Sequence, residues 1–483
     1  MHTTQLFIDN AWVDASSDDH LDVTNPSTGQ THAHMAMGTV ADVDRAVRCA
    51  RHALDNGPWA TMSGYARRKL LLAFAREIQA DSQVIGELKS DDMGMPLLFA
   101  PLAVQVAADN LEYFAGWADK VGGEVIPTRV HGELDYTIRH PVGVVAAIVP
   151  WNAPTFLTIQ KIAPALVAGC TVVLKPSEQA PLAPLHLARC AERAGLPPGV
   201  LNIVTGLGTE VGTALIDHPG VDKISYTGST EVGRVIGQRA AAQLKRCSLE
   251  LGGKSANIIC NDADLDAAVI GATTGVLMNS GQQCIAGSRL LIQRDVYVEV
   301  LDGVAAMAGQ FNVGLARQPT SQMGPLISED HLKRVLSFIE QAADVGEVRL
   351  GGERLGGDLA DGWFVGPTLV ADVDPASELW REEVFGPVLA ARPFDTIDEA
   401  ISLANDSRYG LAGGVWTSDL DTAHHVARSV RTGQMWVNTY LAVVPGAPFG
   451  GFKDSGVGRE GGWAAIEDMT EITNVHVALK PKA

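Results

Sequence analysis

One cysteine in the chain has the surroundings of a catalytic nucleophile. Cys284 stands in the sequence Gly281-Gln-Gln-Cys284-Ile-Ala-Gly287, where glycines and polar neighbours favour an accessible turn. A thiolate is the strongest nucleophile among the side chains near neutral pH, so covalent chemistry at Cys284 is the first hypothesis. Cys170 and Cys260 lie in apolar runs, which predicts buried and inert thiols.

A carboxylate and an amide could assist this nucleophile. Glu250 has leucine on both sides and precedes the pair Gly252-Gly253, a context that favours partial burial and the raised pKa of a general base. The alternative places Glu250 on the polar face of an amphipathic strand. Asn152, in the sequence Pro-Trp-Asn-Ala-Pro, is either a helix cap or an amide that donates to an oxyanion.

Two segments have the glycines and polar side chains of a dinucleotide site. At residues 227–233 an expected strand passes into an expected helix, whose free N–H groups and positive end favour a phosphate. A serine-capped helix is the alternative, because the spacing is not G-x-G-x-x-G. Lys175 and Glu178 follow another expected strand and could hold ribose hydroxyls or form a solvated turn. The sequence Gly206-Leu-Gly208 indicates a plain turn.

Helices and strands alternate in the way needed to position these residues. Residues 40–120 have apolar residues at helical spacing. From residue 142 onward, apolar runs alternate with helical stretches, and a second such series starts after residue 255 and ends near residue 440. The alternation predicts βαβ units and mostly parallel, doubly wound sheets, an α/β fold. The strands expected in the first series are 142–149, 171–174, 200–204, 222–226 and 247–251.

Composition excludes several other classes of protein. The 483 residues predict two or three domains, and 37 basic against 56 acidic residues give a net charge of −19, which disfavours nucleic acids and anionic membranes. No signal peptide or membrane-spanning stretch is evident, so we expect a cytoplasmic protein. No CxxC pair or metal-type spacing occurs, which predicts a reducing compartment and no metal site. The six cysteines are Cys49, Cys170, Cys190, Cys247, Cys260 and Cys284.

Seven motifs follow one another in a characteristic order from about residue 6 to residue 476. They are Pro-Trp-Asn152, Lys175-Pro-Ser-Glu178, Thr-Gly228-Ser-Thr-Glu-Val-Gly233, Glu250-Leu-Gly-Gly-Lys, Gly-Gln-Gln-Cys284, Glu382-Glu383-Val-Phe385-Gly-Pro387 and Pro448-Phe-Gly-Gly-Phe-Lys453. Together they resemble the motifs of the NAD(P)-dependent aldehyde dehydrogenase superfamily. The resemblance implies a Rossmann-type dinucleotide-binding domain, an α/β catalytic domain and a small β oligomerisation flap.

The resemblance also implies a hydrolytic mechanism. Cys284 attacks the aldehyde carbonyl to form a thiohemiacetal, and Asn152 with the backbone N–H of Cys284 forms the oxyanion hole. Glu250 activates the water that hydrolyses the thioester, and it could also accept the thiol proton. CoA-acylating members generally lack the glutamate that stands here as Glu250. A binding protein on this fold would be expected to have lost Cys284, Glu250 or Asn152.

For the cofactor, the resemblance implies NAD. A carboxylate at Glu178 would repel the 2′-phosphate of NADP, which makes NADP the weaker alternative. The implied cofactor-binding residues are Val149, Trp151, Lys175, Glu178, Gly208, Gly228, Ser229, Gly252, Glu383 and Phe385.

The expected substrate pocket is aliphatic. Leu157, Ile285, Leu441 and Val443 occupy its positions, and Ala153 stands where many members have phenylalanine. A quaternary ammonium would need aromatic faces, so the lining predicts an uncharged aliphatic, unsaturated or aromatic aldehyde.

Two outlying segments, 122–140 and 473–479, are expected to be strands with exposed edges. The resemblance assigns them to an oligomerisation flap and implies a homo-oligomer, a dimer or a tetramer. The resulting division is 1–121 and 141–251 for the NAD-binding domain, 252–453 for the catalytic domain, and 122–140 with 454–483 for the flap and C-terminal tail.

Overall fold

The first of two large sheets is organised around five parallel strands. The computed structural model describes residues 3–130 and 132–479. The parallel strands lie in the order β11-β10-β7-β8-β9. This is a doubly wound order, whose winding reverses between β7 and β10 and leaves a crevice at their carboxyl ends. The bounds are β7 (Val144–Ile148), β8 (Thr171–Lys175), β9 (Leu201–Ile203), β10 (Lys223–Thr227) and β11 (Arg246–Glu250).

Short antiparallel strands extend this sheet at both edges. β1 (Leu6–Ile8) and β2 (Ala11–Val13) follow β9, and β19 (Gly456–Val457) pairs with β11. A separate hairpin is formed by β3 (His20–Asn25) and β4 (Gln30–Ala36). None of the strands before residue 40 was predicted from the sequence, and β1 and β2, with three residues each, are too short to show an alternating pattern.

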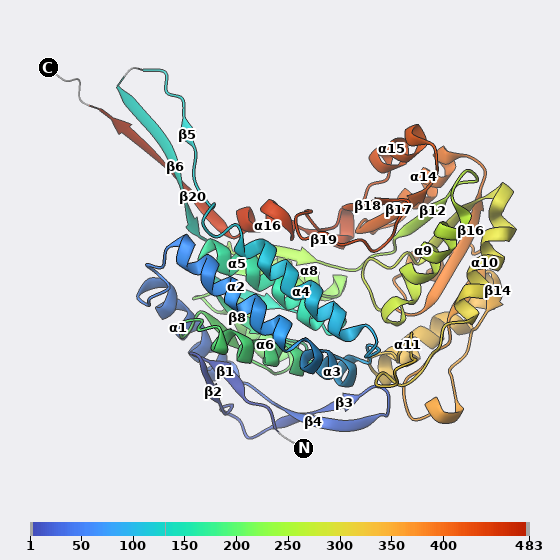
Figure 1. Cartoon of the computed structure of the whole chain (residues 1–483), viewed down its shortest axis with the longest axis horizontal. Coiled ribbons are helices and arrows are strands. Elements are labelled where there is room, and N and C mark those ends of the chain that lie inside the picture. Colours follow the sequence, from blue (N-terminus) through green and yellow to red (C-terminus); the bar gives the residue numbers. More distant parts are fainter. Residues whose placement is uncertain (1–2, 131, 480–483) are drawn as a thin grey trace.

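Helices cover the faces of the first sheet, as the residue pattern predicts (Figure 1). All five residues of β7 and of β8 are buried, as in parallel strands that are covered on both faces. The helical layer expected for residues 40–120 is present. The helices of this body are α1 (Val40–Asp55), α2 (Gly64–Ala80), α3 (Ser82–Met93), α4 (Ala100–Ala115), α5 (Pro154–Ala168), α6 (Leu182–Arg193), α7 (Thr213–Asp217), α8 (Thr230–Ala242) and α16 (Gly462–Asp468).

The second sheet has the order β14-β15-β16-β13-β12-β17-β18, and only β14 is antiparallel to its neighbour among these strands. Its strands are β12 (Ala256–Ile259), β13 (Arg289–Gln293), β14 (Glu347–Leu350), β15 (Thr368–Ala371), β16 (Val388–Phe394), β17 (Ala412–Trp416) and β18 (Gln434–Val437). The accompanying helices are α9 (Leu265–Leu277), α10 (Tyr297–Gly309), α11 (Glu329–Glu340), α12 (Ala342–Val345), α13 (Glu378–Arg381), α14 (Ile397–Asn405) and α15 (Leu420–Ser429). The α/β fold class with two such series is therefore confirmed.

A thin arm of three antiparallel strands projects from the first body (Figure 1). It contains β5 (Val125–Ile126), β6 (Glu133–Pro141) and β20 (Thr470–Ala478) in the order β20-β6-β5. The expected outlying strands are thus present. In the described part of the expected tail segment, 454–479, β20 belongs to the arm, whereas β19 joins the first sheet and α16 packs against α5. In the described part of the chain, no helix has the length and apolarity to span a bilayer.

Candidate active site

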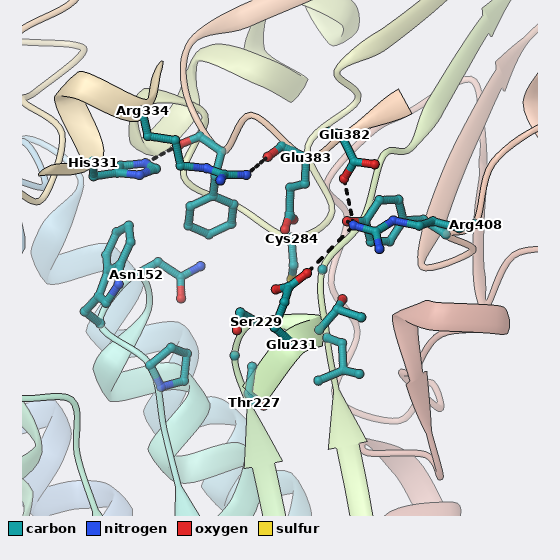
Figure 2. A pocket seen from close by; sticks show the side chains of 18 of the residues that line it. Asn152, Thr227, Ser229, Glu231, Cys284, His331, Arg334, Glu382, Glu383 and Arg408 are labelled. Atoms are coloured by element: carbon teal, nitrogen blue, oxygen red, sulfur yellow. Dashed lines mark hydrogen bonds and ion pairs between the residues drawn. The ribbon is translucent and has the colours of Figure 1, made fainter. Parts of the chain in front are cut away.

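A cavity of about 520 Å³ opens between the two bodies at the switch point of the first sheet. Segments that follow β7, β10 and β11 line one side, including Asn152, Ser229 and Gly252. The other side comes from the second body and includes Cys284 and Glu383 (Figure 2). Ligands of doubly wound sheets bind at this place, because the connecting loops diverge there.

Cys284 follows a backbone segment that lies in the left-handed region. Asn279 has φ 54°, Ser280 has φ 57° and Gly281 has φ 73°. Residues with a Cβ atom lose about 1–3 kcal/mol in sparsely populated conformations, so the surroundings must hold this segment in place. At Gly281 a Cβ atom would lie 2.0 Å from the carbonyl oxygen of Gly386. The glycine of the Gly-Gln-Gln-Cys motif is therefore required by the close approach of another backbone segment.

Side-chain amides tie this segment to the end of β7. Asn279 Nδ2 donates to the backbone carbonyl of Asn152, and Asn152 Nδ2 donates to the carbonyl of Gln282, each at 3.0 Å. Gln282 Oε1 accepts a hydrogen bond from the N–H of Ile327 at 2.9 Å. An amide has two N–H groups, so Asn152 keeps one for a ligand oxygen. Asn152 is not the cap of α5, whose N-cap position is taken by Ala153.

The Cys284 thiol is half-buried in a group of apolar side chains. It packs against an apolar cluster whose buried members are Ile285, Leu411, Ala412 and Trp436. Burial, followed by the charges of Glu383 and Glu250, raises the pKa of the thiol to about 12. The thiol is therefore protonated at neutral pH in the free protein, and it needs a proton acceptor or a change of surroundings to become a nucleophile.

The other five cysteines lie outside the cavity. Cys170 and Cys260 are buried, as expected from their apolar runs, and so is Cys190, while Cys49 and Cys247 are half-buried. Burial raises the pKa of each of these thiols, to about 11 for Cys170 and Cys247. Cys284 is thus distinguished by its access to the cavity rather than by a lowered pKa.

Glu250 is buried at the end of β11, with 3 % of its surface exposed. Neither carboxylate oxygen has a hydrogen-bond partner within the described part of the chain. Burial is the largest effect that raises the pKa of Glu250 well above its usual value, and the neighbouring carboxylate of Glu460 raises it further. Because its pKa is raised, the carboxylate of Glu250 is a stronger base than an exposed glutamate, which is the property required of a general base.

A buried ion pair lies beside Glu250. Lys161 Nζ, on α5, is 2.5 Å from Glu460 Oε1, and both side chains are almost fully buried. Ser225 Oγ donates to the same carboxylate oxygen at 3.1 Å, and Gln160 Nε2 donates to the other at 3.2 Å. The pair is fully hydrogen-bonded, as buried charges must be. It sets the electrostatic surroundings of Glu250, and no sequence motif marked Lys161 or Glu460.

The glycine pair after Glu250 brings Glu383 close to the chain. A Cβ atom at Gly252 would lie 2.3 Å from Glu383 Oε2, and one at Gly253 would lie 2.3 Å from the carbonyl oxygen of Cys284. The N–H of Gly253 donates to Glu383 Oε1 at 2.9 Å. Burial raises the pKa of Glu383 to about 7 despite this hydrogen bond. Glycine at positions 252 and 253 therefore allows the Glu383 side chain and the Cys284 backbone to approach closely. Any larger residue at either position would prevent this approach.

Six of the ten residues expected to bind a cofactor line this cavity. They are Trp151, Gly228, Ser229, Gly252, Glu383 and Phe385. Ser229 also caps α8, since its Oγ accepts a hydrogen bond from the N–H of Val232. At Gly228 a Cβ atom would lie 2.0 Å from the hydroxyl oxygen of Tyr226, which explains the glycine.

The other four expected residues lie outside the cavity, three of them close to one another. Lys175 ends β8 opposite the end of β7, and its Nζ is 2.8 Å from Glu178 Oε2. The N–H of Val149 donates to the carbonyl of Lys175 at 3.1 Å. Gly208 begins a short helical turn, Gly208–Gly212, whose last residue lies near the Lys175 side chain. The carboxyl ends of β8, β7 and β10 thus form a continuous path to the cavity.

Several residues of the cavity were not identified from the sequence. His331 Nε2 donates to the carbonyl of Phe385 at 2.8 Å, and the ring of Trp151 lies edge-on to that of Phe385 (Figure 2). Arg334 Nη2 donates to the backbone carbonyl of Glu383 at 3.0 Å, and Arg408 also lines the cavity. These residues come from α11 and the loop before β17, and no local motif marks them, because their role depends on the packing of distant segments.

A second, narrow cavity lies near Cys284 on the side away from the first sheet. Phe156, Trp436 and Phe449 line it together with Val443. Trp436 and Phe449 also belong to the apolar group that contacts Cys284. The expected aliphatic lining is therefore incomplete: Val443 is in place, but three aromatic rings accompany it. The sequence did not show this because the direction of a side chain on β18 and its neighbouring loop depends on tertiary packing.

The fold and the site together define an α/β enzyme with a thiol between a nucleotide-type crevice and an apolar cavity. The family model of the aldehyde dehydrogenase family matches residues 12–475. A phenylacetaldehyde dehydrogenase from Pseudomonas fluorescens is 43% identical over 483 residues, which cover 98% of this chain and 96% of the relative. The chain belongs to the aldehyde dehydrogenase family, as its motifs predict.

Solved structures agree with this assignment. An aldehyde dehydrogenase from Bacillus cereus, described as an NAD+ complex, has a TM-score of 0.97 at 40% identity, with 99% of this chain and 97% of that chain covered. An NAD-dependent aldehyde dehydrogenase from Sinorhizobium meliloti has a TM-score of 0.97 at 38% identity, with 100% and 96% covered. The expected fold is therefore confirmed over the whole chain.

Replacing Glu383 by glutamine should make Cys284 more reactive in the free protein. Glutamine keeps an oxygen for the N–H of Gly253 but removes the charge that raises the pKa of the thiol. The substitution should lower the pKa of the thiol, and a fall of one pKa unit raises the thiolate fraction by up to tenfold. Since the thiolate is the form that reacts, we expect iodoacetamide to alkylate Cys284 at least about threefold faster in Glu383→Gln at about pH 8.5. Mass spectrometry of the Cys284 peptide measures the rate, with Cys247 as the internal control. An equal or slower rate would contradict the electrostatic effect of Glu383.

Proposed function

We propose that the protein oxidises an aldehyde to the carboxylic acid with NAD, through a covalent intermediate on Cys284. The observation that carries this proposal is the position of the Cys284 thiol on the wall of the cavity, which Asn152 also lines, with the carboxyl group of Glu250 close enough to raise its pKa. Segment 252–453 carries the nucleophile, and the first body, 1–121 with 141–251, holds the cofactor.

Glu250 accepts the thiol proton of Cys284 and later releases it to solvent, and the sulfur attacks the aldehyde carbon, so that the carbonyl oxygen becomes an oxyanion. The free N–H of the Asn152 amide and the backbone N–H of Cys284 donate to this oxygen. Donors of this kind commonly contribute on the order of 10²–10³ in rate because they are in place before the charge develops. NAD, when bound, supplies the hydride acceptor that turns the aldehyde adduct into a thioester.

Glu250 then accepts a proton from a water molecule as that water attacks the thioester carbon. The bond between this carbon and the sulfur of Cys284 breaks, which releases the carboxylic acid and the Cys284 thiolate. The raised pKa of Glu250 suits this step, since it makes the carboxylate a stronger base than an exposed glutamate. The presence of this glutamate favours hydrolysis over transfer of the acyl group to CoA.

The residues present fit a dinucleotide. The N-terminus of α8, a helix of 13 residues, faces the cavity through Ser229 and Thr230, where a phosphate is favoured. Arg334 and Arg408 add positive charge to the same cavity. The Lys175–Glu178 pair stands further along the path of strand ends, where it can hold the hydroxyls of the adenosine ribose. Gly208 and Val149 lie beside this pair.

Glu178 should determine the preference for NAD over NADP. A carboxylate at the ribose hydroxyls repels a 2′-phosphate, and Lys175 would hold the phosphate once that charge is removed. We expect Glu178→Gln to shift the ratio of kcat/KM for NADP to that for NAD by at least about tenfold towards NADP. Steady-state kinetics with both cofactors measures the ratio, with Glu192→Gln on α6 as an acidic control. Comparable kcat/KM values for NAD and NADP in the unmodified protein would contradict this role.

Two substitutions separate the chemical steps. Cys284→Ala should abolish aldehyde-dependent NADH formation, because no adduct can form. Glu250→Gln should still release about one NADH per subunit in the first turnover at alkaline pH, whereas its steady-state rate falls by about 10²–10⁴, as expected for loss of a general base. Stopped-flow absorbance of NADH measures both phases. Wild-type turnover in Glu250→Gln with normal acylation would contradict its role, and activity in Cys284→Ala would contradict the nucleophile.

The arm is proposed to join subunits into a dimer or a tetramer. Its strand β20 is nine residues long and lies at a sheet edge, and such edges pair readily with another chain. Apolar side chains of the arm are exposed, among them Val125, Ile138 and Ile472.

We expect Ile138→Glu to shift the protein towards the monomer in multi-angle light scattering, because a charge on this face would be buried on assembly. Val298→Glu, at an exposed apolar residue of α10, is the matched control and should leave the mass unchanged. A monomeric unmodified protein would contradict the proposal.

A further inference from the structure

Two groups of side chains bring three potential metal ligands together in the described part of the chain, 3–130 and 132–479. In each group, one ligand atom from every member lies within 4.8 Å of the others. None of the members lines the cavity at Cys284. The first group is His20, Asp22 and His34, and the second is Asp81, His186 and Cys190.

The second group already holds a cation of the protein itself. Arg193 Nη2 is 2.7 Å from Asp81 Oδ2 and 3.6 Å from Cys190 Sγ, and His186 Nε2 is 2.6 Å from the same Asp81 oxygen. Burial raises the pKa of Cys190 to about 12, which opposes formation of the thiolate that a metal requires. The guanidinium of Arg193 therefore lies where a metal ion would bind, and this group is a structural ion-pair cluster.

The register of the β3–β4 hairpin places the members of the first group on one face. Asp22 of β3 is paired with His34 of β4, and His20 precedes Asp22 by two residues, so the three side chains point to the same side. The ring centroids of His20 and His34 are 4.9 Å apart, and His34 Nδ1 is 2.7 Å from Asp22 Oδ1. Asp22 has no lysine or arginine as an ion-pair partner among the described residues, in contrast to Asp81.

The second oxygen of Asp22 is held by a neighbour on β4. Thr31 Oγ1 donates to Asp22 Oδ2 at 3.2 Å, while Oδ1 lies beside the His34 imidazole. Carboxylates that bind metals commonly have such a partner, because it fixes the direction of the other oxygen. Ligand atoms around a tetrahedral zinc ion are about 3.3 Å apart, given bond lengths of about 2.0–2.2 Å. Since His20 and Asp22 are exposed, small side-chain rotations can close the group around an ion.

The donor set indicates which metals would bind. Two imidazoles and one carboxylate suit zinc, nickel or copper, whereas magnesium and calcium prefer oxygen ligands alone. Asp18 and Asp19 precede His20 in the chain, and the net charge is −19, so the field of the protein attracts a divalent cation. The absence of a metal site was predicted from spacing along the chain. His34 is twelve residues from Asp22, and it is the hairpin that brings them together.

We propose that His20, Asp22 and His34 form a surface site for a divalent ion of the zinc type, with water completing its coordination. The hairpin lies at the edge of the molecule opposite to the arm (Figure 1), and its turn reaches the second body, where the N–H of Trp363 donates to the carbonyl of Pro26 at 3.2 Å. The ion joins β3 to β4 and thereby opposes local separation of the two strands.

Hydrogen exchange followed by mass spectrometry tests the site in the full chain without an affinity tag. Zn²⁺ at ten times its Kd should slow exchange of the interstrand amides in peptides from residues 20–36 by about elevenfold. The physical reason is that binding lowers the population of the opened hairpin by the factor 1 + [Zn²⁺]/Kd. Mg²⁺ at the same concentration should leave these peptides unchanged, because it binds imidazole poorly.

Isothermal titration calorimetry with zinc chloride measures the affinity, in a Cys284→Ala background that removes the thiol of the cavity. We expect one ion per subunit at the hairpin. His20→Gln and His34→Gln should each weaken its binding by at least about tenfold, since each loses one of the three ligands. His425→Gln is the matched control, because His425 is an exposed imidazole 3.2 Å from the carboxylate of Asp398, and it should leave the affinity unchanged.

The inference would be overturned if zinc did not bind, or if it bound both hairpin variants as tightly as the parent. Loss of affinity in His34→Gln alone would also overturn it, because the exposed His20 should be a ligand too. Protection confined to peptides outside 20–36, or equal protection by Mg²⁺, would indicate a general attraction of cations to acidic surface and would likewise refute the site.

Discussion

The site depends on a backbone segment that is held in an unfavourable conformation. Asn279, Ser280 and Gly281 adopt left-handed φ angles directly before the Cys284 turn. The amides of Asn152 and Asn279 connect the segment to the loop after β7, and the amide of Gln282 connects it to Ile327. The Asn152 amide also faces the cavity. The same side chain that would stabilise an oxyanion therefore helps to fix the position of the Cys284 thiol. Strain of this kind persists where the surrounding structure determines it.

Burial of charge is the second constraint on the site. Glu250, Glu383 and the thiol of Cys284 lie together where water is largely excluded, and burial raises the pKa of each. The Lys161–Glu460 pair adds a further buried carboxylate beside Glu250. The net charge of −19 opposes the approach of an anionic dinucleotide. Binding must therefore rely on local groups, namely the N-terminus of α8, Lys175 and the arginines of the cavity.

Much of the fold could be predicted because its signals are local. Apolar runs such as 142–149 and 171–174 became β7 and β8, since parallel strands covered on both faces need continuous apolar residues. The strands β1 and β2 could not be predicted, because they have three residues each and join the sheet through the pairing of β1 with the distant strand β9. Three aromatic residues of the second cavity and the pair Lys161–Glu460 were also missed, since each joins segments far apart in the chain.

The sequence by itself determined the family, the order of the motifs and the residue types for covalent catalysis, because close approaches and chemistry restrict those positions to particular residues. Gly252 and Gly253 are examples, as a Cβ atom at either would collide with Glu383 or with the Cys284 backbone. Only the tertiary structure decided how these residues act together. It buried Glu250 beside Glu460 and raised rather than lowered the pKa of Cys284. Burial and electrostatics depend on all neighbours in space, and most of those neighbours are remote in the sequence.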